Sequence, residues 1–180
     1  NVEERLTSPF TTLILANGKP AVELSFRFAA YEIGGETVRL SGHLDEVVTE
    51  ADGALWVRDD KTTKGALGAN YFQQFSPNNQ MSLYSVAGKV ILDAPVRGVL
   101  VKAAQIGVNF TRFQTQQVPR PQAVLTEWLD DTQRWIEAAH HSAVTGHYPK
   151  NDKACGNYGG CPFQKVCSVS PSHRDAWLAE

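Results

Sequence analysis

The sequence lacks the features that mark several large classes of protein. No apolar run approaches the length of a membrane-spanning helix, and no charged-then-apolar secretory signal opens the chain. Internal repeats and low-complexity tracts are also absent. The sequence therefore argues against a membrane protein and against a repeat array, and we expect no membrane partner.

Charge of one sign is scarce as well. The 17 Lys and Arg residues nearly balance the 19 Asp and Glu residues, which gives a formal net charge of −2. This balance argues against a protein coated in positive charge for nonspecific DNA binding, although a local basic groove remains possible. With 180 residues, 42% of them hydrophobic, the chain can bury one substantial core. Because it starts at Asn1 rather than Met, we treat it as a possible fragment that lacks an upstream segment.

Cysteine is rare and unevenly placed. The three cysteines are Cys155, Cys161 and Cys167, so all of them lie within residues 155–167. A disulfide framework would use an even number spread through the chain, whereas a metal or cluster site would group its ligands in this way. Together with the lack of a signal, this grouping favours a reducing, cytoplasmic setting.

Hydrophobic patterning predicts a series of strands and helices. Period-two alternation with aromatics predicts the strands, and Asp52-Gly53 predicts a turn that joins two of them in an antiparallel hairpin. The expected strands are residues 21–30, 37–49, 54–63, 96–108 and 109–118, and the expected helices are residues 79–92 and 121–145. The residues of the second helix expected to face inward are Val124, Leu125, Trp128, Leu129, Trp135 and Ile136.

The order of these elements predicts the fold class. Three strands, a helix, two strands and a helix are typical of an α/β protein with a mixed central β-sheet flanked by helices. The rest of the chain is rich in Gly and Cys and predicts an irregular segment. We therefore expect a core domain over residues 1–150 and a Cys-rich tail over residues 151–180 that packs on it.

The stretch VRDDKTTK, residues 57–64, places a charge cluster at the end of an apolar strand. Because residues two apart share a face of a strand, Asp59 and Lys61 point the same way and Asp60 points the opposite way. If the hairpin pairs symmetrically about its turn, Asp45 on the preceding strand comes close to facing Asp59. Two carboxylates held together repel each other unless a cation lies between them.

This arrangement suits a divalent ion at a phosphodiester. Carboxylate oxygens that leave room for water and a phosphate are typical ligands of Mg²⁺ or Mn²⁺, and the Asp60 backbone carbonyl could supply a further ligand. Lys61 would stand beside the ion, placed to orient or deprotonate a water or to offset charge on a phosphorane-like transition state. Taken alone, an Asp-Asp-Lys sequence is more often a solvated turn.

Three segments in order resemble the motifs of a known family. Gly42-His43-Leu44-Asp45, then Val57-Arg58-Asp59-Asp60-Lys61-Thr62, then NNQMSLYSVA are similar to the "GxxD" strand, the "DxK" strand and the "QxxxY" helix of the RecB-like branch of the PD-(D/E)xK nucleases. The resemblance covers roughly residues 20–170, and the ordered combination is far more specific than any single motif. It implies a restriction-endonuclease-like core.

The resemblance also implies roles for the acidic residues and the lysine. Asp45 and Asp59 would be metal ligands, and Lys61 would be catalytic. Glu23, in AVELSF, matches a glutamate often seen on the family's first strand, where it would be a further metal ligand.

Gln80 and Tyr84 match the helix motif, and their spacing of four residues puts both on one helical face. The resemblance implies that they line the DNA side of the site and contribute to catalysis. The residues alone leave other interpretations open, since Gln80 could cap interior polar groups and Tyr84 could belong to the core.

The cysteine trio resembles the ending of RecB-like nucleases that carry a four-iron, four-sulfur cluster, such as CRISPR-associated exonucleases and phage-type members. In these proteins a fourth cysteine precedes the nuclease core, so the resemblance implies a structural cluster whose fourth ligand is not in this chain. The first gap here is five residues where two is commoner. Spacing alone leaves zinc, or three small buried loop residues, as alternatives.

The leading hypothesis is a metal-dependent DNA nuclease, an exonuclease of recombination, repair or phage DNA processing. Its DNA would follow a local groove of Lys64, Lys89, Arg112 and Arg120. The alternative is a DNA-binding or assembly module on a nuclease fold that no longer cuts. A small iron–sulfur electron carrier is a third class, which the large predicted sheet disfavours.

Overall fold

The computed structural model describes residues 8–178. The chain forms two compact units, Asn1–Ile136 and Glu137–Glu180. The boundary falls inside helix α4 (Gln122–Thr145), whereas the sequence predicted a domain boundary after this helix, at residue 150. A long helix can extend out of the unit in which it begins, because its own hydrogen bonds satisfy its backbone.

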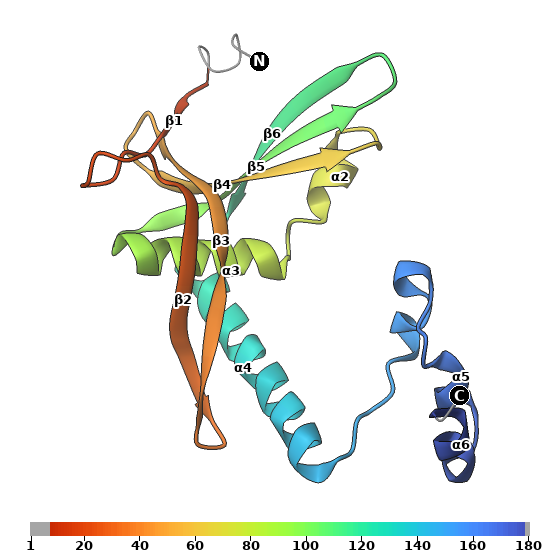
Figure 1. Ribbon diagram of the computed structural model, residues 1–180. Helices are drawn as coiled ribbons and strands as arrows, with labels where there is room; N and C mark the ends of the chain where they lie inside the picture. The colour runs from red at the N-terminus through yellow and green to blue at the C-terminus, as the bar shows by residue number, and fades with distance from the viewer. Residues whose placement is uncertain (1–7, 179–180) are drawn as a thin grey trace. The chain divides into compact units, whose positions relative to one another are not determined.

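The first unit is built on a mixed six-stranded sheet with helices against it, which confirms the predicted α/β class (Figure 1). The strands are β1 (Phe10–Thr12), β2 (Val22–Ile33), β3 (Glu36–Glu50), β4 (Leu55–Thr63), β5 (Val96–Ile106) and β6 (Thr111–Pro119). The order is β1-β3-β4-β5-β6, with β2 also paired to β3. The sequence predicted every strand except β1. β4 and β5 are parallel, and the crossover between them contains α2 (Ala69–Gln73) and α3 (Asn79–Leu92).

Helix α3 has the bounds that the sequence predicted. Asn78 caps its start, because the Asn78 side chain accepts hydrogen bonds from the backbone N–H groups of Gln80 and Met81 at 3.0 and 3.3 Å. At the other end Asp93 adopts a left-handed conformation, and Pro95 follows. The caps fix where the helix begins, and so where Gln80 lies.

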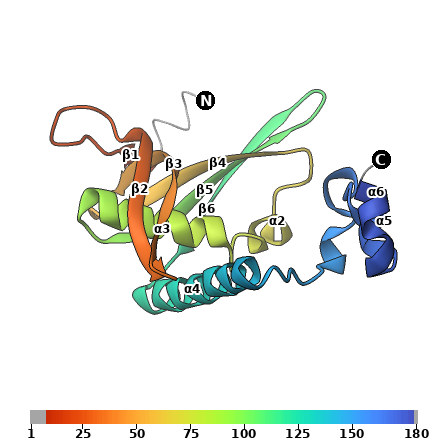
Figure 2. The same ribbon diagram turned by 60° about the horizontal axis from the view of Figure 1, so that its bottom comes forward.

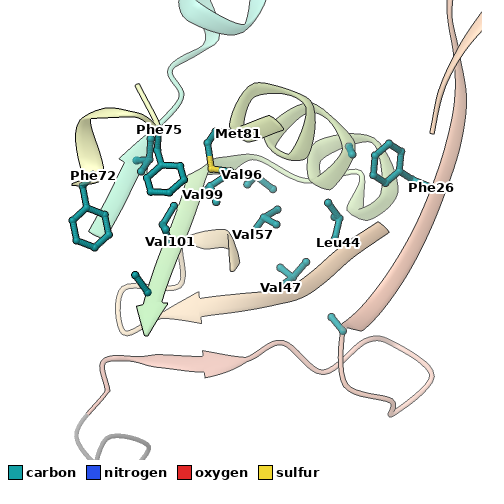
Figure 3. Packing of buried hydrophobic residues seen from close by; sticks show 14 residues of the cluster. Phe26, Leu44, Val47, Val57, Phe72, Phe75, Met81, Val96, Val99 and Val101 are labelled. Carbon is teal, nitrogen blue, oxygen red and sulfur yellow. The ribbon is translucent and has the colours of Figure 1, made fainter. Parts of the chain in front are cut away.

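The hydrophobic core lies between the sheet and helices α2 and α3 (Figure 3). Val57 and Val99 of β4 and β5 are fully buried there, as is Met81 of α3. Gly88 lets α3 approach the sheet closely, because a Cβ at this position would lie 3.0 Å from the Val57 side chain. The core thus holds the start of α3 against the strand that carries the charge cluster.

Helix α4 is less buried than its apolar pattern predicted. Leu125 is buried as expected, but Val124 is 39% exposed and Trp135 is 77% exposed, so their predicted inward orientation is wrong. The helix is held to β2 by the Tyr31 hydroxyl, which donates to the Leu129 carbonyl oxygen at 2.9 Å. None of the helices within residues 8–178 is long and apolar enough to cross a membrane.

After α4 the second unit contains only short helical turns joined by irregular segments, in the part of the tail that the structure describes. They are η1 (Asp152–Ala154), η2 (Asn157–Gly159), α5 (Gln164–Ser168), η3 (Pro171–His173) and α6 (Arg174–Leu178). This agrees with the irregular tail that the Gly and Cys content predicted.

Candidate active site

The charged stretch of β4 begins where its pairing with β3 ends. The two strands pair as far as Glu46↔Arg58, and the next step along both strands brings Asp45 across from Asp59. At this point the Asp45 carboxylate accepts a hydrogen bond from the Asp60 backbone N–H, through Oδ2 at 3.2 Å. Where the backbone pairing of the two strands ends, this side-chain hydrogen bond links β3 to β4. The bond holds the Asp45 carboxylate against β4.

Asp59 is a buried carboxylate with one charged partner. Its residue is 2% exposed, and the Lys61 ammonium donates to Oδ1 at 3.0 Å and lies 2.8 Å from Oδ2. Burial raises the pKa of Asp59 above its usual value, Lys61 opposes the rise, and the charges of Asp45 and Asp60 add to it. A further cation beside Asp59 would therefore favour its ionised form.

A hydrogen-bonded chain leads from Lys61 to α3. The Lys61 ammonium donates to Gln80 Oε1 at 3.0 Å, and Gln80 Nε2 donates to the Tyr84 hydroxyl at 3.0 Å. The α3 cap and the spacing of one helical turn put both side chains on the face turned to β4. The structure thus brings Asp45, Asp59, Lys61, Gln80 and Tyr84 together in one continuous constellation.

Tyr71 on α2 belongs to the same neighbourhood, and the sequence reasoning missed it. Burial raises the pKa of its phenol, and the charges of Lys61 and Asp59 both act on it. Its ring packs edge-on against Phe72 and Phe75, with centroids 5.1 and 5.6 Å apart. The only sequence signal was the aromatic run just after the Asp-x-Lys strand.

The chemistry of the donor set fits a divalent ion. Asp59 Oδ2 is buried and accepts no well-aligned hydrogen bond from the described residues, and its close charged contact is the Lys61 ammonium at 2.8 Å. Because a carboxylate oxygen carries two lone pairs, this contact leaves capacity for a metal cation. Mg²⁺ is commonly held by one or two carboxylates, with water and phosphate oxygens completing its shell. Asp45 and Asp59 provide those two carboxylates.

Glu23 does not complete a larger cluster. It lies on β2 between Val22 and Leu24, which pair with Glu46 and Leu44, so it sits at the level of Asp45. Its side chain is exposed and its backbone is left-handed, with φ of 50°. Within residues 8–178, no three His, Cys, Asp or Glu side chains gather into a group that could hold a metal ion. The predicted third protein ligand is thus not assembled.

Arg120 is a correction to the predicted DNA groove. The residue is 3% exposed, and its guanidinium donates to Ser82 Oγ at 3.3 Å and to the carbonyl oxygens of Phe75 and Pro119 at 2.6 and 3.0 Å. It ties the loop before α3 to the end of β6. A buried arginine that satisfies backbone carbonyls cannot contact DNA, so that prediction is wrong.

The other three predicted DNA contacts lie on separate elements. Lys64 is exposed in the loop after β4, and Arg112 is exposed on β6. Lys89 Nζ donates to Gln122 Oε1 at 3.0 Å, which links α3 to the start of α4. Lys64 and Arg112 share one end of the sheet, because Thr63, Gln105 and Arg112 form one row across β4, β5 and β6.

The three cysteines are not gathered into a ligand set. Cys155 and Cys161 are half-buried and Cys167 is exposed, and all three are free thiols. The Cys161 N–H donates to the Cys155 carbonyl oxygen at 2.9 Å, so their loop is closed through the backbone. The described residues therefore do not fit a preformed cluster site.

The face of β4 opposite Asp59 carries a second charged network. Glu46 is 5% exposed, forms an ion pair with its cross-strand partner Arg58, and accepts a hydrogen bond from the Thr12 hydroxyl. Arg58 Nε also lies 3.5 Å from Asp60 Oδ1. A cavity of about 490 Å³ opens beside this network. Because the pair lies one step from Asp45 and Asp59, it fixes the strand register that brings them together.

Breaking the Glu46–Arg58 ion pair should lower the stability of the protein and weaken its binding of Mg²⁺. Arg58→Glu places two carboxylates across from each other, and we expect it to destabilise the protein by about 3 kcal/mol. The half-saturating Mg²⁺ concentration in cleavage and in thermal stabilisation should rise in parallel. The double variant Glu46→Arg with Arg58→Glu should recover most of both. A double variant no more stable than the single one would contradict this role.

Comparisons with known proteins identify the family to which the chain belongs. The family model described as the PD-(D/E)XK nuclease superfamily matches residues 3–168. Among solved structures, the crystal structure of SSO0001 is similar, with 14% sequence identity and a TM-score of 0.40, and the match covers 82% of this chain. The chain spans 59% of the length of that protein. No curated protein matches the chain.

Proposed function

Because the chain belongs to the PD-(D/E)XK nuclease superfamily, we propose that it is a metal-dependent deoxyribonuclease acting at Asp45, Asp59 and Lys61. The observation that supports this most is the buried Asp59 carboxylate, which lies across from Asp45 and whose Oδ2 contacts the Lys61 ammonium but accepts no well-aligned hydrogen bond from the described residues. We further propose that it is an exonuclease of the RecB-like branch, serving recombination, repair or phage DNA processing.

Asp45 and Asp59 would hold Mg²⁺ or Mn²⁺. When bound, such an ion supplies Lewis acidity and lowers the pKa of a coordinated water. The chain's own residues do the rest. Lys61 is anchored by Asp59 and Gln80 and so presents a fixed positive charge to the developing charge on the phosphate. Tyr84 accepts from Gln80 and keeps its own O–H to donate to a phosphate oxygen.

The proposed DNA contacts and the proposed iron–sulfur cluster involve residues outside the catalytic constellation. Lys64 and Arg112, at the end of the sheet reached by β4, would contact the DNA backbone. The iron–sulfur hypothesis for Cys155, Cys161 and Cys167 stays separate, because no step of this chemistry involves those thiols. Iron and acid-labile sulfide analysis of anaerobically purified protein tests it directly.

Cleavage assays test the proposed function. The protein is incubated with end-labelled single-stranded, double-stranded and circular DNA in Mg²⁺ or Mn²⁺, beside Asp59→Asn and Lys61→Met. Asp131→Asn, an exposed carboxylate on α4, serves as the matched control. We expect wild type and the control to degrade linear DNA from its ends, and both site variants to leave it intact.

The same assay distinguishes the nuclease from the alternative, a DNA-binding or assembly module that does not cut. DNA that is retained but never cut in either metal would refute the nuclease and favour a binding or assembly module. Cutting of circular DNA at the rate of linear DNA would refute exonuclease action while leaving the nuclease in place.

A further inference from the structure

The β5–β6 hairpin carries the sheet past the end of β4. Thr63, the last residue of β4, pairs with Gln105, and Gln105 pairs with Arg112 of β6. Beyond this row the two strands continue without β4, and near the tip the Gly107 N–H donates to the Phe110 carbonyl oxygen at 2.9 Å. The tip therefore projects beyond the strand that carries the site (Figures 1 and 2).

Two phenylalanines on either side of Arg112, Phe110 at the tip and Phe113 on β6, are equally exposed but lie on opposite faces. Arg112 falls on the face of Lys61 by strand alternation. Phe110 precedes β6, and its ring lies on the Arg112 side of the hairpin, since the Arg112 guanidinium lies over it. Phe113 falls on the other face, where Lys102 Nζ lies 5.8 Å from its ring centroid. Their exposed fractions are 46% for Phe110 and 45% for Phe113. The hairpin thus presents a ring to the site face and a matched ring away from it.

The Phe110 ring is held in place before any ligand arrives. Its Cδ1, Cε1 and Cζ atoms lie against Gly107, where a Cβ would come within 2.4 Å of the ring. The Arg112 guanidinium carbon lies 5.1 Å from the ring centroid. A nearly half-exposed ring that is restrained by a glycine and a guanidinium costs little entropy to use as a binding surface.

The hairpin also has the charge that a nucleic acid prefers. Residues 96–119 contain no Asp or Glu, in a chain whose net charge is −2. Of their basic residues, Arg112 lies on the site face, whereas Lys102 lies on the Phe113 face and Arg97 pairs with Glu50 and Asp52. Between Arg112 and Val118, the site face of β6 carries the exposed amides of Gln114 and Gln116. From strand spacing and rise, Phe110 lies on the order of 15 Å from Lys61.

We propose that Phe110 and Arg112 form a stacking platform for an unpaired DNA base. The base belongs to the DNA strand whose backbone reaches the Asp59 site. The Phe110 ring stacks on the base, and the Arg112 guanidinium neutralises the neighbouring phosphate. Bases inside a duplex are already stacked on each other, so this platform selects single strands or frayed ends. The proposal rests on the proposed function, since it names the form of DNA that reaches the site.

Binding measured without metal tests the platform. Fluorescence anisotropy in a chelator compares three probes: oligo(dT), an abasic strand of the same length and a blunt duplex. Phe110→Leu should weaken oligo(dT) binding about tenfold, with little effect on the abasic strand. Phe113→Leu, the matched control, should change oligo(dT) binding less than about twofold. Arg112→Gln should lower the salt dependence on both single strands by about one counterion.

The outcomes distinguish failure of the stacking platform from failure of the proposed nuclease function. Equal losses for Phe110→Leu and Phe113→Leu, equal losses on oligo(dT) and the abasic strand, or no binding to oligo(dT) would each overturn the platform. A loss confined to the blunt duplex would overturn it too, in favour of a duplex contact. Because the measurement needs no cleavage, a protein that binds oligo(dT) through Phe110 but cuts nothing refutes only the proposed nuclease.

Discussion

Asp59→Asn is expected to abolish metal-dependent DNA cleavage, with a loss of about 10³-fold or more, while the metal-free fold stays at least as stable as wild type. The substitution keeps the shape of the side chain and removes the charge that would bind the ion. Losing an anionic ligand costs several kcal/mol of transition-state stabilisation, and each 1.4 kcal/mol is about tenfold in rate. Single-turnover cleavage at saturating Mg²⁺ measures the loss.

The stability half of this prediction follows from the raised pKa of Asp59. Burial is the main cause of that rise, so in the metal-free protein ionised Asp59 is less favourable in the folded state than in the unfolded state. Its stabilising contribution is complete below the usual carboxyl pKa and is lost as the pH rises through the raised folded value. Asn cannot ionise, so the melting temperature of Asp59→Asn should exceed that of wild type at neutral pH and converge with it in acid.

Thermal denaturation in a chelator across this pH range, and then with added Mg²⁺, gives the comparison. Mg²⁺ should raise the melting temperature of wild type and leave that of Asp59→Asn unchanged. A variant that melts below wild type at neutral pH, or that still responds to Mg²⁺, would show that Asp59 is a structural carboxylate and not a metal ligand.

Lys61→Met should be nearly as damaging to cleavage and, unlike Asp59→Asn, should destabilise the fold. Removing the ammonium leaves the Asp59 carboxylate buried without its cationic partner, which we expect to cost about 2 to 3 kcal/mol. Gln80 loses its donor as well, so the link to α3 opens. Cleavage should fall by about 10²- to 10³-fold, because a fixed charge at the phosphate is lost.

A double variant tests whether the unpaired Asp59 charge causes the loss of stability in Lys61→Met. Asp59→Asn combined with Lys61→Met removes both charges, so it should regain the stability that Lys61→Met alone loses, yet remain inactive. Lys64→Met, an exposed lysine three residues further along, is the stability control and should melt like wild type. Denaturant unfolding in a chelator measures the differences. If the double variant is no more stable than Lys61→Met, the ion pair is not what stabilises this part of β4.

Much of the first unit could be predicted because its signals are local. Strand alternation, the Asp52-Gly53 turn and helical spacing each arise within a few residues, and they yielded every strand but β1 and the full extent of α3. β1 is three residues long, too short for alternation to mark it. In the long helix, the apolar pattern overstated burial at Val124 and Trp135, because a pattern records which residues could be covered and not whether a neighbour covers them.

The sequence by itself determined that Asp59 and Lys61 share a face of β4 and that Gln80 and Tyr84 share a face of α3, because both follow from the period of a strand or a helix. Only the tertiary structure decided that Lys61 meets Gln80, that Arg120 is buried and that Tyr71 lies near the site. It also decided that Phe110 and Phe113 lie on opposite faces of one hairpin. Those outcomes depend on contacts between segments far apart in the chain, and local patterns carry no record of which segments meet or how deeply a charge is buried.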